Sequence, residues 1–203
     1  MIRLYDFTLS GNAHKVRNLL SLLAIEHERI PVDLVAGEQR GAAFRSLNPF
    51  GKVPVLIDDD VVLRDSSAIL VYLGRKFGGA DWLPVDAEGE ARVQEWLVTA
   101  STDIAEGPGF ARLIELFGAD GDIAAARKRA HAVLAIFEAH LEREPFLAAE
   151  RPTIADVANY SYIALAPDGG VSLAPYPHVR SWLERLEKLP GFEVAPARPE
   201  VAA

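Results

Sequence analysis

The sequence predicts an α/β domain followed by an all-helical domain. Strand-type and helix-type stretches alternate over the first 78 residues. From residue 88 onward only the apolar spacing of helices occurs, and the segment Gly78–Glu88 between the two parts carries glycine, proline and acidic residues. We therefore expect an α/β domain at residues 1–78, a linker at 79–87 and an all-helical domain at 88–203.

The α/β part is expected to follow the order βαβαββα. Its strands are predicted at residues 2–7, 29–34, 55–57 and 61–64, and its helices at 11–24, 42–47 and 66–77. The first two strands are linked through a helix and should be parallel, whereas the acidic turn Asp58-Asp59-Asp60 joins the last two as a hairpin. This is the order of a thioredoxin-like domain.

The second part is predicted to contain helices at 88–105, 110–117, 122–142, 153–165 and 177–189. Gly107-Pro108-Gly109 should interrupt the first of them, because proline has no N–H to donate. Thr153 and Asp156 have the spacing of a capping box and predict the start of a buried helix. Val157, Tyr160 and Ile163 or Ala164 of that helix should face the core, and residues 195–203 are expected to fray.

Composition excludes several kinds of chemistry. The net charge of −8 comes without a basic block, which argues against nucleic acid as a partner. The absence of cysteine removes disulfide, dithiol-redox and thiolate–metal chemistry, and the five histidines show no metal-ligand spacing. Neither a signal peptide nor an apolar run of the roughly 20 residues that a membrane span needs is apparent. We expect a cytoplasmic protein that binds no metal and no membrane.

The segment Asn48–Leu56 places a proline inside a strand-type stretch, between Val53 and Val55. Proline cannot donate to a sheet ladder, so this position is unusual. A cis Val53-Pro54 bond would explain it and would turn the N–H and C=O of Val53 outward. An extended peptide can pair with such groups as an added strand.

Asp65 and Ser66 open the apolar helix predicted at 66–77. A helix start offers unpaired N–H groups and a partial positive charge, which suit the carboxylate of a ligand. The same pair is also an ordinary helix cap. The succession of turn, Val-Pro strand, hairpin and Asp-Ser helix favours a ligand site over a cap alone.

Six segments, in this order, resemble the cytosolic glutathione transferases, in particular bacterial members of the serine type. They are Leu4–Ser10 with Lys15–Arg17 downstream, the loop around Val53-Pro54, Asp65-Ser66, the linker, Arg151–Asp156 and Tyr176–Leu183. The resemblance covers nearly the whole chain and implies glutathione as co-substrate, laid across the first domain. The glutathione-binding residues that it implies are Arg40, Lys52, Val53, Pro54, Asp65 and Ser66.

Each part of glutathione receives its own contacts under this resemblance. Val53 would pair with the cysteinyl backbone, and Asp65 with Ser66 would hold the γ-glutamyl end. Lys52 and Arg40 would lie near the glycyl carboxylate, although the pair Gln39-Arg40 stands where many relatives carry His-Lys.

Catalysis needs the thiolate of glutathione, because the thiol is a poor nucleophile. Ser10 matches the serine of the serine-type classes, and its hydroxyl would donate to the sulfur. Asn12 is the alternative catalytic donor, through its side-chain amide, while Thr8 and Tyr5 match less well. Ser10 has a structural explanation too, as the N-cap of the first helix.

The electrophile pocket is expected between the two domains. It would be lined by Phe7, Thr8 and Leu9 from the first and by Phe110, Arg112 and Leu113 from the second, all placed by position only. A cation at Arg112 would favour an anionic co-substrate, although a surface role is the simpler interpretation.

The resulting hypothesis is a glutathione transferase that acts on small, mostly apolar electrophiles, and the family implies a homodimer. Two alternatives stay open: a non-catalytic binding or interaction protein on the same fold, and a glutathione-dependent isomerase, peroxidase or dehalogenase. An isomerase is less well matched because Leu9-Ser10-Gly11 replaces the Ser-Ser-Cys opening typical of that class.

Overall fold

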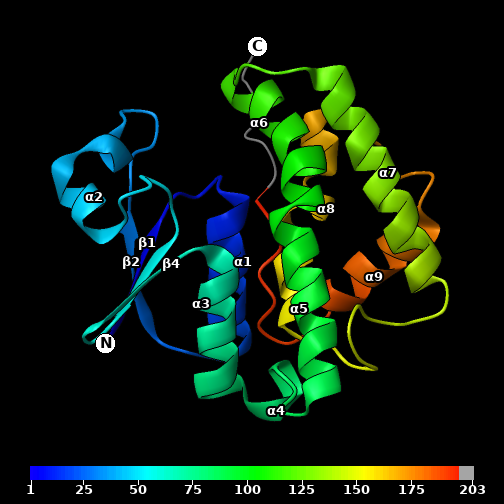
Figure 1. Ribbon diagram of the computed structural model, residues 1–203, viewed down its shortest axis with the longest axis horizontal. Coiled ribbons are helices and arrows are strands. Elements are labelled where there is room, and N and C mark those ends of the chain that lie inside the picture. The colour runs from blue at the N-terminus through cyan, green and yellow to red at the C-terminus, as the bar shows by residue number, and fades with distance from the viewer. Residues whose placement is uncertain (197–203) are drawn as a thin grey trace.

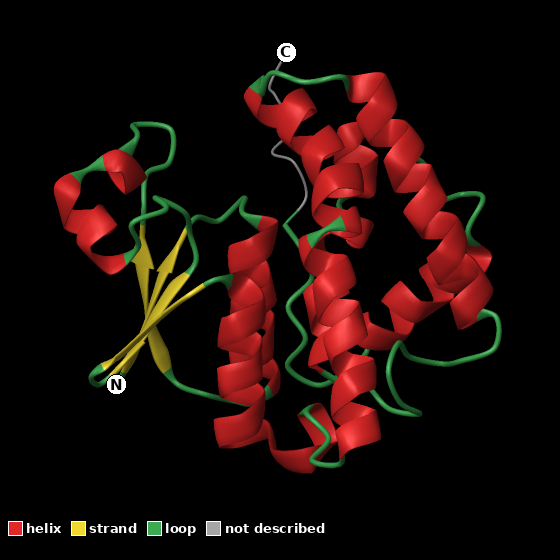
Figure 2. Ribbon diagram, viewed as in Figure 1, coloured by secondary structure: helices red, strands yellow, loops and turns green. Residues whose placement is uncertain are grey.

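The computed structural model describes residues 1–196 and places a small mixed sheet beside a larger helical domain (Figures 1 and 2). The sheet contains β2 (His27–Pro31), β1 (Ile2–Asp6), β3 (Val55–Asp58) and β4 (Val61–Arg64), in that spatial order. β1 and β2 are parallel, and the other two pairs are antiparallel. The predicted βαβαββα order and the hairpin are therefore confirmed.

Helices cover both faces of this sheet (Figure 2). α1 (Gly11–Leu22) and α3 (Ser66–Leu73) lie on the face toward the helical domain, and α2 (Ala42–Leu47) lies on the other. Successive side chains of β3 point to opposite faces of the sheet, so the strand contributes to two apolar clusters. Leu56 packs into the main core, while Val55 and Ile57 pack with Phe44 of α2.

Several element ends differ from the expectation. β2 begins and ends earlier than predicted, because its partner β1 has only five residues and pairs Ile2 with His27 and Asp6 with Pro31. The helix expected at 66–77 ends as an α-helix at Leu73 and continues as a wide, π-type turn over Gly74–Gly78. Part of the expected linker is also helical, as α4 (Gly79–Trp82), and the domain boundaries themselves stay a prediction.

The helical domain contains α5 (Ala87–Ser101), α6 (Phe110–Phe117), α7 (Ile123–Leu141), α8 (Ile154–Ala164) and α9 (Pro177–Glu187). As predicted, Gly107-Pro108-Gly109 interrupts the regular helix, in a π-type turn over Ala105–Gly109. A side chain at Gly107 would meet the backbone of Ala130 at 3.0 Å, so glycine permits the close approach of α7. Among residues 1–196, none of the helices combines the length and the apolar character that a bilayer crossing demands.

α8 occupies the centre of the helical domain. The predicted capping box is present, since Thr153 N–H donates to Asp156 and the Thr153 hydroxyl accepts from Ala155 N–H. Asp156 also accepts from the indole of Trp182 at 2.9 Å, so its buried carboxylate is fully engaged. Val157, Tyr160 and Ile163 are buried, as the sequence predicted.

The segment after α9 runs back along α1. The carbonyl of Glu193 lies 2.9 Å from His14 Nε2, and the Glu193 N–H donates to Asn18 Oδ1 at 3.1 Å. Ala195 is buried, which contradicts the expectation that it frays, and the remainder of that expected tail from residue 197 lies outside the described residues.

Candidate active site

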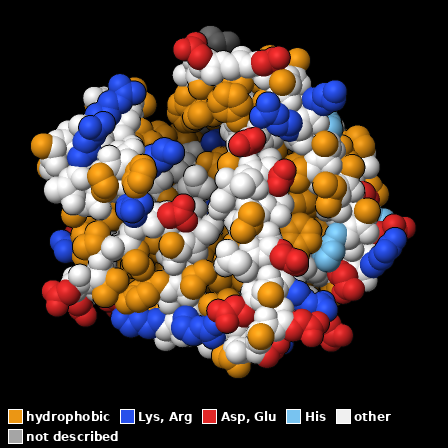
Figure 3. Space-filling model, viewed as in Figure 1, with side chains coloured by type: hydrophobic (Ala, Val, Ile, Leu, Met, Phe, Trp, Pro, Cys, Tyr) orange, Lys and Arg blue, Asp and Glu red, His pale blue; other side chains and the backbone are white. Residues whose placement is uncertain are grey.

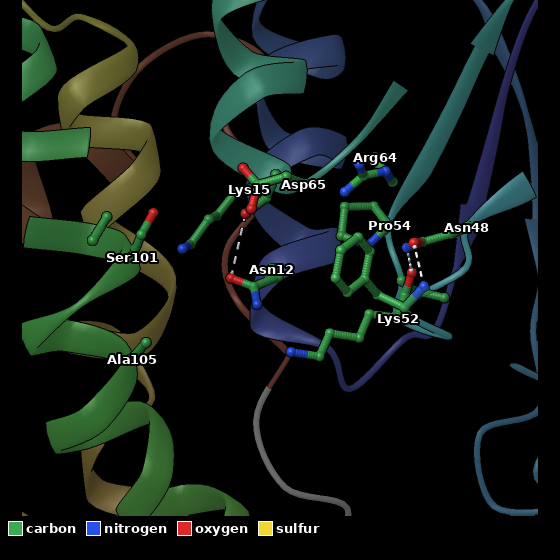
Figure 4. A pocket seen from close by; sticks show the side chains of 13 residues that line it. Asn12, Lys15, Asn48, Lys52, Pro54, Arg64, Asp65, Ser101 and Ala105 are labelled. Carbon is green, nitrogen blue, oxygen red and sulfur yellow. Dashed lines mark hydrogen bonds between the residues drawn. The ribbon is translucent and has the colours of Figure 1, made fainter. Parts of the chain in front are cut away.

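A cavity of about 360 Å³ lies between the α/β domain and α5 (Figure 4). It brings together the Val-Pro loop, the start of α3 and the first turns of α1. Six residues that the sequence singled out line it: Asn12, Lys52, Val53, Pro54, Asp65 and Ser66. Seven further residues complete the lining: Lys15, Asn48, Phe50, Arg64, Ala100, Ser101 and Ala105.

The Val53-Pro54 bond is cis, as predicted. The preceding loop is held by the buried Asn48, whose side-chain amide donates to the Lys52 carbonyl at 2.6 Å. The amide oxygen of Asn48 accepts from Phe50 N–H at 3.1 Å. Both ends of this buried amide are thus satisfied by the loop backbone, which fixes the edge of the cavity.

Asp65 caps α3, so the ordinary-cap interpretation is confirmed for one of its carboxylate oxygens. Oδ1 accepts from Ser67 N–H at 2.9 Å and from Ala68 N–H at 3.2 Å. The backbone of Asp65 has φ of +76°, a left-handed conformation that is unusual for a residue with a side chain and recurs at functional sites. The neighbouring Ser66 hydroxyl donates to Asn12 Oδ1 at 3.4 Å and links α3 to α1.

Ser10 is the N-cap of α1, and its Oγ accepts from Ala13 N–H at 3.2 Å. It does not line the cavity, whereas Asn12 does. The start of α1 lies close against α8, because a side chain at Gly11 would meet the ring of Tyr162 at 2.6 Å. Ser10 and Asn12 both stand at this helix start, and the geometry leaves each available as the thiolate donor.

Lys15 is a cavity residue to which the sequence assigned no role. Its side chain is 1% exposed, and its Nζ lies 5.3 Å from the centre of the Tyr162 ring. Burial lowers the pKa of Lys15 to about 8, while the nearby Asp65 carboxylate acts to raise it. A signal for this residue exists in the sequence, because Lys15 is three positions after Asn12 and so shares its helix face.

Cations also occur at the other side of the cavity, although not the expected pair. Lys52 lines the cavity, but Arg40 does not, because it ends an exposed 3₁₀ turn over Glu38–Arg40. Arg64 lines it instead, and its guanidinium lies 4.5 Å from the centre of the Phe50 ring. Arg64 directly precedes Asp65 at the end of β4. This position next to a predicted ligand-binding residue is the sequence signal that could have identified Arg64 as a cavity residue.

The residues expected in the electrophile pocket divide into two groups. Apolar ones meet across the domains, as the rings of Phe7 and Phe117 lie 6.3 Å apart and Leu113 is 44% exposed. Figure 3 shows hydrophobic side chains gathered over α6, beside a hollow of the surface. Phe110 packs against Gly121, and Thr8 and Leu9 supply backbone carbonyls to buried arginines.

Arg112 departs from both of its expected roles. Its side chain is 3% exposed; its Nε donates to Asp168 at 3.0 Å and its Nη1 donates to the Leu9 carbonyl at 2.9 Å. Because these partners hold the guanidinium inside the protein, Arg112 braces the chain just before Ser10. It is neither a surface residue nor a cation open to a co-substrate.

Residues 1–196 contain no group of three or more His, Cys, Asp or Glu side chains that could hold a metal ion.

Sequence comparison identifies the family. Residues 9–76 match the model of the glutathione S-transferase N-terminal domain, and residues 107–190 match that of the C-terminal domain. The chain is 34% identical to glutathione S-transferase 3 of Zea mays, over 95% of this chain and 91% of the maize protein. The chain belongs to the cytosolic glutathione S-transferase family.

Solved structures of family members agree with the fold. A glutathione S-transferase from Pseudomonas fluorescens is 30% identical, with a TM-score of 0.90 over 96% of this chain and 98% of that one. A glutathione transferase homolog from Drosophila mojavensis, solved with bound glutathione, is 28% identical, with a TM-score of 0.85 over 93% of this chain and 88% of that one. The glutathione transferase fold of the present chain is thus an α/β domain followed by a helical domain.

Proposed function

We propose that this glutathione transferase binds glutathione in the cavity between the α/β domain and α5 and activates its thiol for attack on small, mostly apolar electrophiles. One observation carries the proposal: the Val53-Pro54 loop, Lys52, the Asp65-Ser66 helix start and Asn12 converge on a single cavity. The comparisons do not favour a non-catalytic protein, an isomerase or a peroxidase.

In this proposal Val53 pairs with the cysteinyl backbone of glutathione, and Lys52 faces the glycyl carboxylate. Asp65 has one carboxylate oxygen beyond the Oδ1 that caps α3, and it suits the amino group of the γ-glutamyl end. Arg40 does not line the cavity, so Lys52 and Arg64 are the better-placed cations for the glycyl end.

Ser10 and Asn12 are the proposed thiolate donors. The Oγ of Ser10 accepts a hydrogen bond at the helix cap, which leaves its hydroxyl proton free to donate to sulfur. Asn12 accepts through Oδ1, so its amide N–H groups remain donors. Lowering a thiol pKa by about two units from about 8.5 needs roughly 2.7 kcal/mol, and one hydrogen bond to a charged group supplies about 1.5–3 kcal/mol.

An ultraviolet titration of bound glutathione against pH tests this function, because the thiolate absorbs where the thiol does not. Binding with a thiol pKa clearly below the free value is expected. Ser10→Ala and Asn12→Ala should then identify the donor. Substitution of the residue that donates to sulfur should raise the pKa of the bound thiol, and substitution of the other should leave it unchanged. No binding at millimolar glutathione would overturn the proposal.

A homodimer and a cytoplasmic location belong to the same proposal, on the strength of the family alone. Light scattering coupled to size-exclusion chromatography should give about twice the 22.1 kDa chain mass. The mass of a single chain would exclude the dimer.

A further inference from the structure

Lys15 is a buried cation that has the Asp65 carboxylate nearby but is not paired with it. It is 1% exposed, and no hydrogen bond or ion pair joins its ammonium to any of residues 1–196. Lysine is almost never fully buried unless it is paired, because removing an ammonium from water is costly. The ring of Tyr162 offers it only a cation–π contact at 5.3 Å. The side chain lines the cavity, so the missing partner can come from a ligand.

Lys15 lies at one end of the cavity, near Asp65. Figure 4 shows its side chain extending from α1 toward Ser101 of α5, with Asp65 on one side and Asn12 on the other. Lys52 approaches from the opposite side of Asn12 in this view. Lys15 therefore shares the Asp65 end, where the proposed function places the γ-glutamyl group.

The helix start at this end has few donors left for a carboxylate. The N–H groups of Ser67 and Ala68 both donate to Asp65 Oδ1, so the first turn of α3 is largely satisfied by its own cap. The Ser67 hydroxyl is in turn within 3.1 Å of the Ser101 hydroxyl. The Ser66 N–H does not take part in this cap and remains as a single backbone donor. A bound carboxylate also needs a positive charge, and Lys15 is the lysine at this end of the cavity that can supply it.

The charges of glutathione match this arrangement. At neutral pH it carries one ammonium and two carboxylates. Asp65 complements the ammonium and Lys52 the glycyl carboxylate, which leaves the α-carboxylate of the γ-glutamyl residue. From this match, and resting on the proposed function, we propose that Lys15 binds that α-carboxylate and makes it a required feature of the thiol substrate.

Calorimetric titration with S-methylglutathione tests the proposal without interference from the thiol. The second probe is γ-aminobutyryl-S-methylcysteinylglycine, which lacks only the α-carboxylate. The wild-type protein should bind the first probe about 10-fold to 100-fold more tightly, the range expected for a hydrogen bond to a charged group. Lys15→Met should lose this preference by weakening S-methylglutathione and leaving the decarboxylated probe unchanged.

Three controls separate this proposal from its alternatives. Lys188→Met makes the same change at an exposed lysine and should bind both probes as the wild type does. Lys52→Met should weaken both probes alike, because both keep the glycyl carboxylate. The ultraviolet thiol pKa of bound glutathione should be the same in Lys15→Met and wild type.

Several outcomes would overturn the assignment. Equal binding of the two probes by the wild-type protein would do so without any variant, even if Lys15→Met failed to fold. Equal weakening of both probes in Lys15→Met, or a raised thiol pKa of bound glutathione, would place Lys15 elsewhere in the site. Failure of the wild-type protein to bind S-methylglutathione at all would instead refute the proposed function.

Discussion

Replacing Lys15 by methionine should stabilise the unliganded protein. Methionine keeps the length and apolar stem of lysine but removes the ammonium that has no partner among the described residues. In the folded protein burial lowers the pKa of Lys15 from the usual 10.5 to about 8. At pH 7 this difference corresponds to about 3 kcal/mol of lost stability, because protonated lysine is less favourable inside than in the unfolded chain.

The contact with Tyr162 does not offset this gain. Its cation–π energy is on the order of 0.5–2 kcal/mol. The thioether of methionine on the same ring supplies about 0.3–1.5 kcal/mol. For a chain of this size about 3 kcal/mol corresponds to an increase in Tm of roughly 6–12 °C.

The effect must also depend on pH. Between about pH 8 and 10.5 the unfolded chain holds a proton on Lys15 that the folded protein has released, so wild-type stability rises with pH in this window. The advantage of Lys15→Met should therefore shrink from about 3 kcal/mol at pH 7 to about 1 kcal/mol at pH 10.

Thermal unfolding without glutathione, followed by circular dichroism at pH 7 and pH 10, measures both effects. Lys188→Met serves as the control for a general effect of losing a lysine and should leave Tm unchanged at either pH. A Tm for Lys15→Met at or below that of the wild type at pH 7 would refute the reasoning. So would a Tm advantage that stays constant between the two pH values.

Three other changes have defined outcomes. Arg112→Ala should cost about 3–5 kcal/mol in urea unfolding, because it leaves Asp168 without its buried partner; a loss under 1 kcal/mol would contradict the pairing. Burial and a nearby arginine lower the pKa of His14 from 6.5 to about 4, so wild-type stability should fall by about 3 kcal/mol from pH 6.5 to pH 4, and His14→Gln should flatten that slope in urea titrations. Gly11→Ala should lose about 1–3 kcal/mol, since the added carbon would lie 2.6 Å from the Tyr162 ring; unchanged Tm would show that the ring moves aside.

The fold was predictable because its signals are local. Alternation and helical spacing located every strand and main helix of the α/β domain, and the cap at Asp65 and the proline at position 54 marked the cavity edge. The end of β2 was mispredicted because strand length is set by the partner strand, which lies elsewhere in the chain. Local pattern therefore gives element type more securely than element ends.

The site was only partly predictable, because burial of a charge depends on distant contacts. A lysine on a helix normally predicts a solvated position, but Lys15 is buried, with Tyr162 of α8 packed against the start of α1 and 5.3 Å from its Nζ. Arg112 was assigned to a pocket or the surface, whereas Asp168, far along the chain, holds it inside. The residues that flank Lys15 and Arg112 in the sequence do not reveal that Tyr162 and Asp168 are their partners.

The segment of residues 191–195, which runs back along α1, has a consequence for biosynthesis. His14 and Asn18 of α1 are translated 179 and 175 residues before Glu193, so their contacts with Glu193 form only after the helices α5 to α9 have been synthesised. A nascent chain that still lacks this segment lacks the partner of His14 Nε2 and of Asn18 Oδ1. α1 therefore obtains these two contacts only after the helical domain has been translated, and a chain truncated before residue 193 lacks both hydrogen bonds.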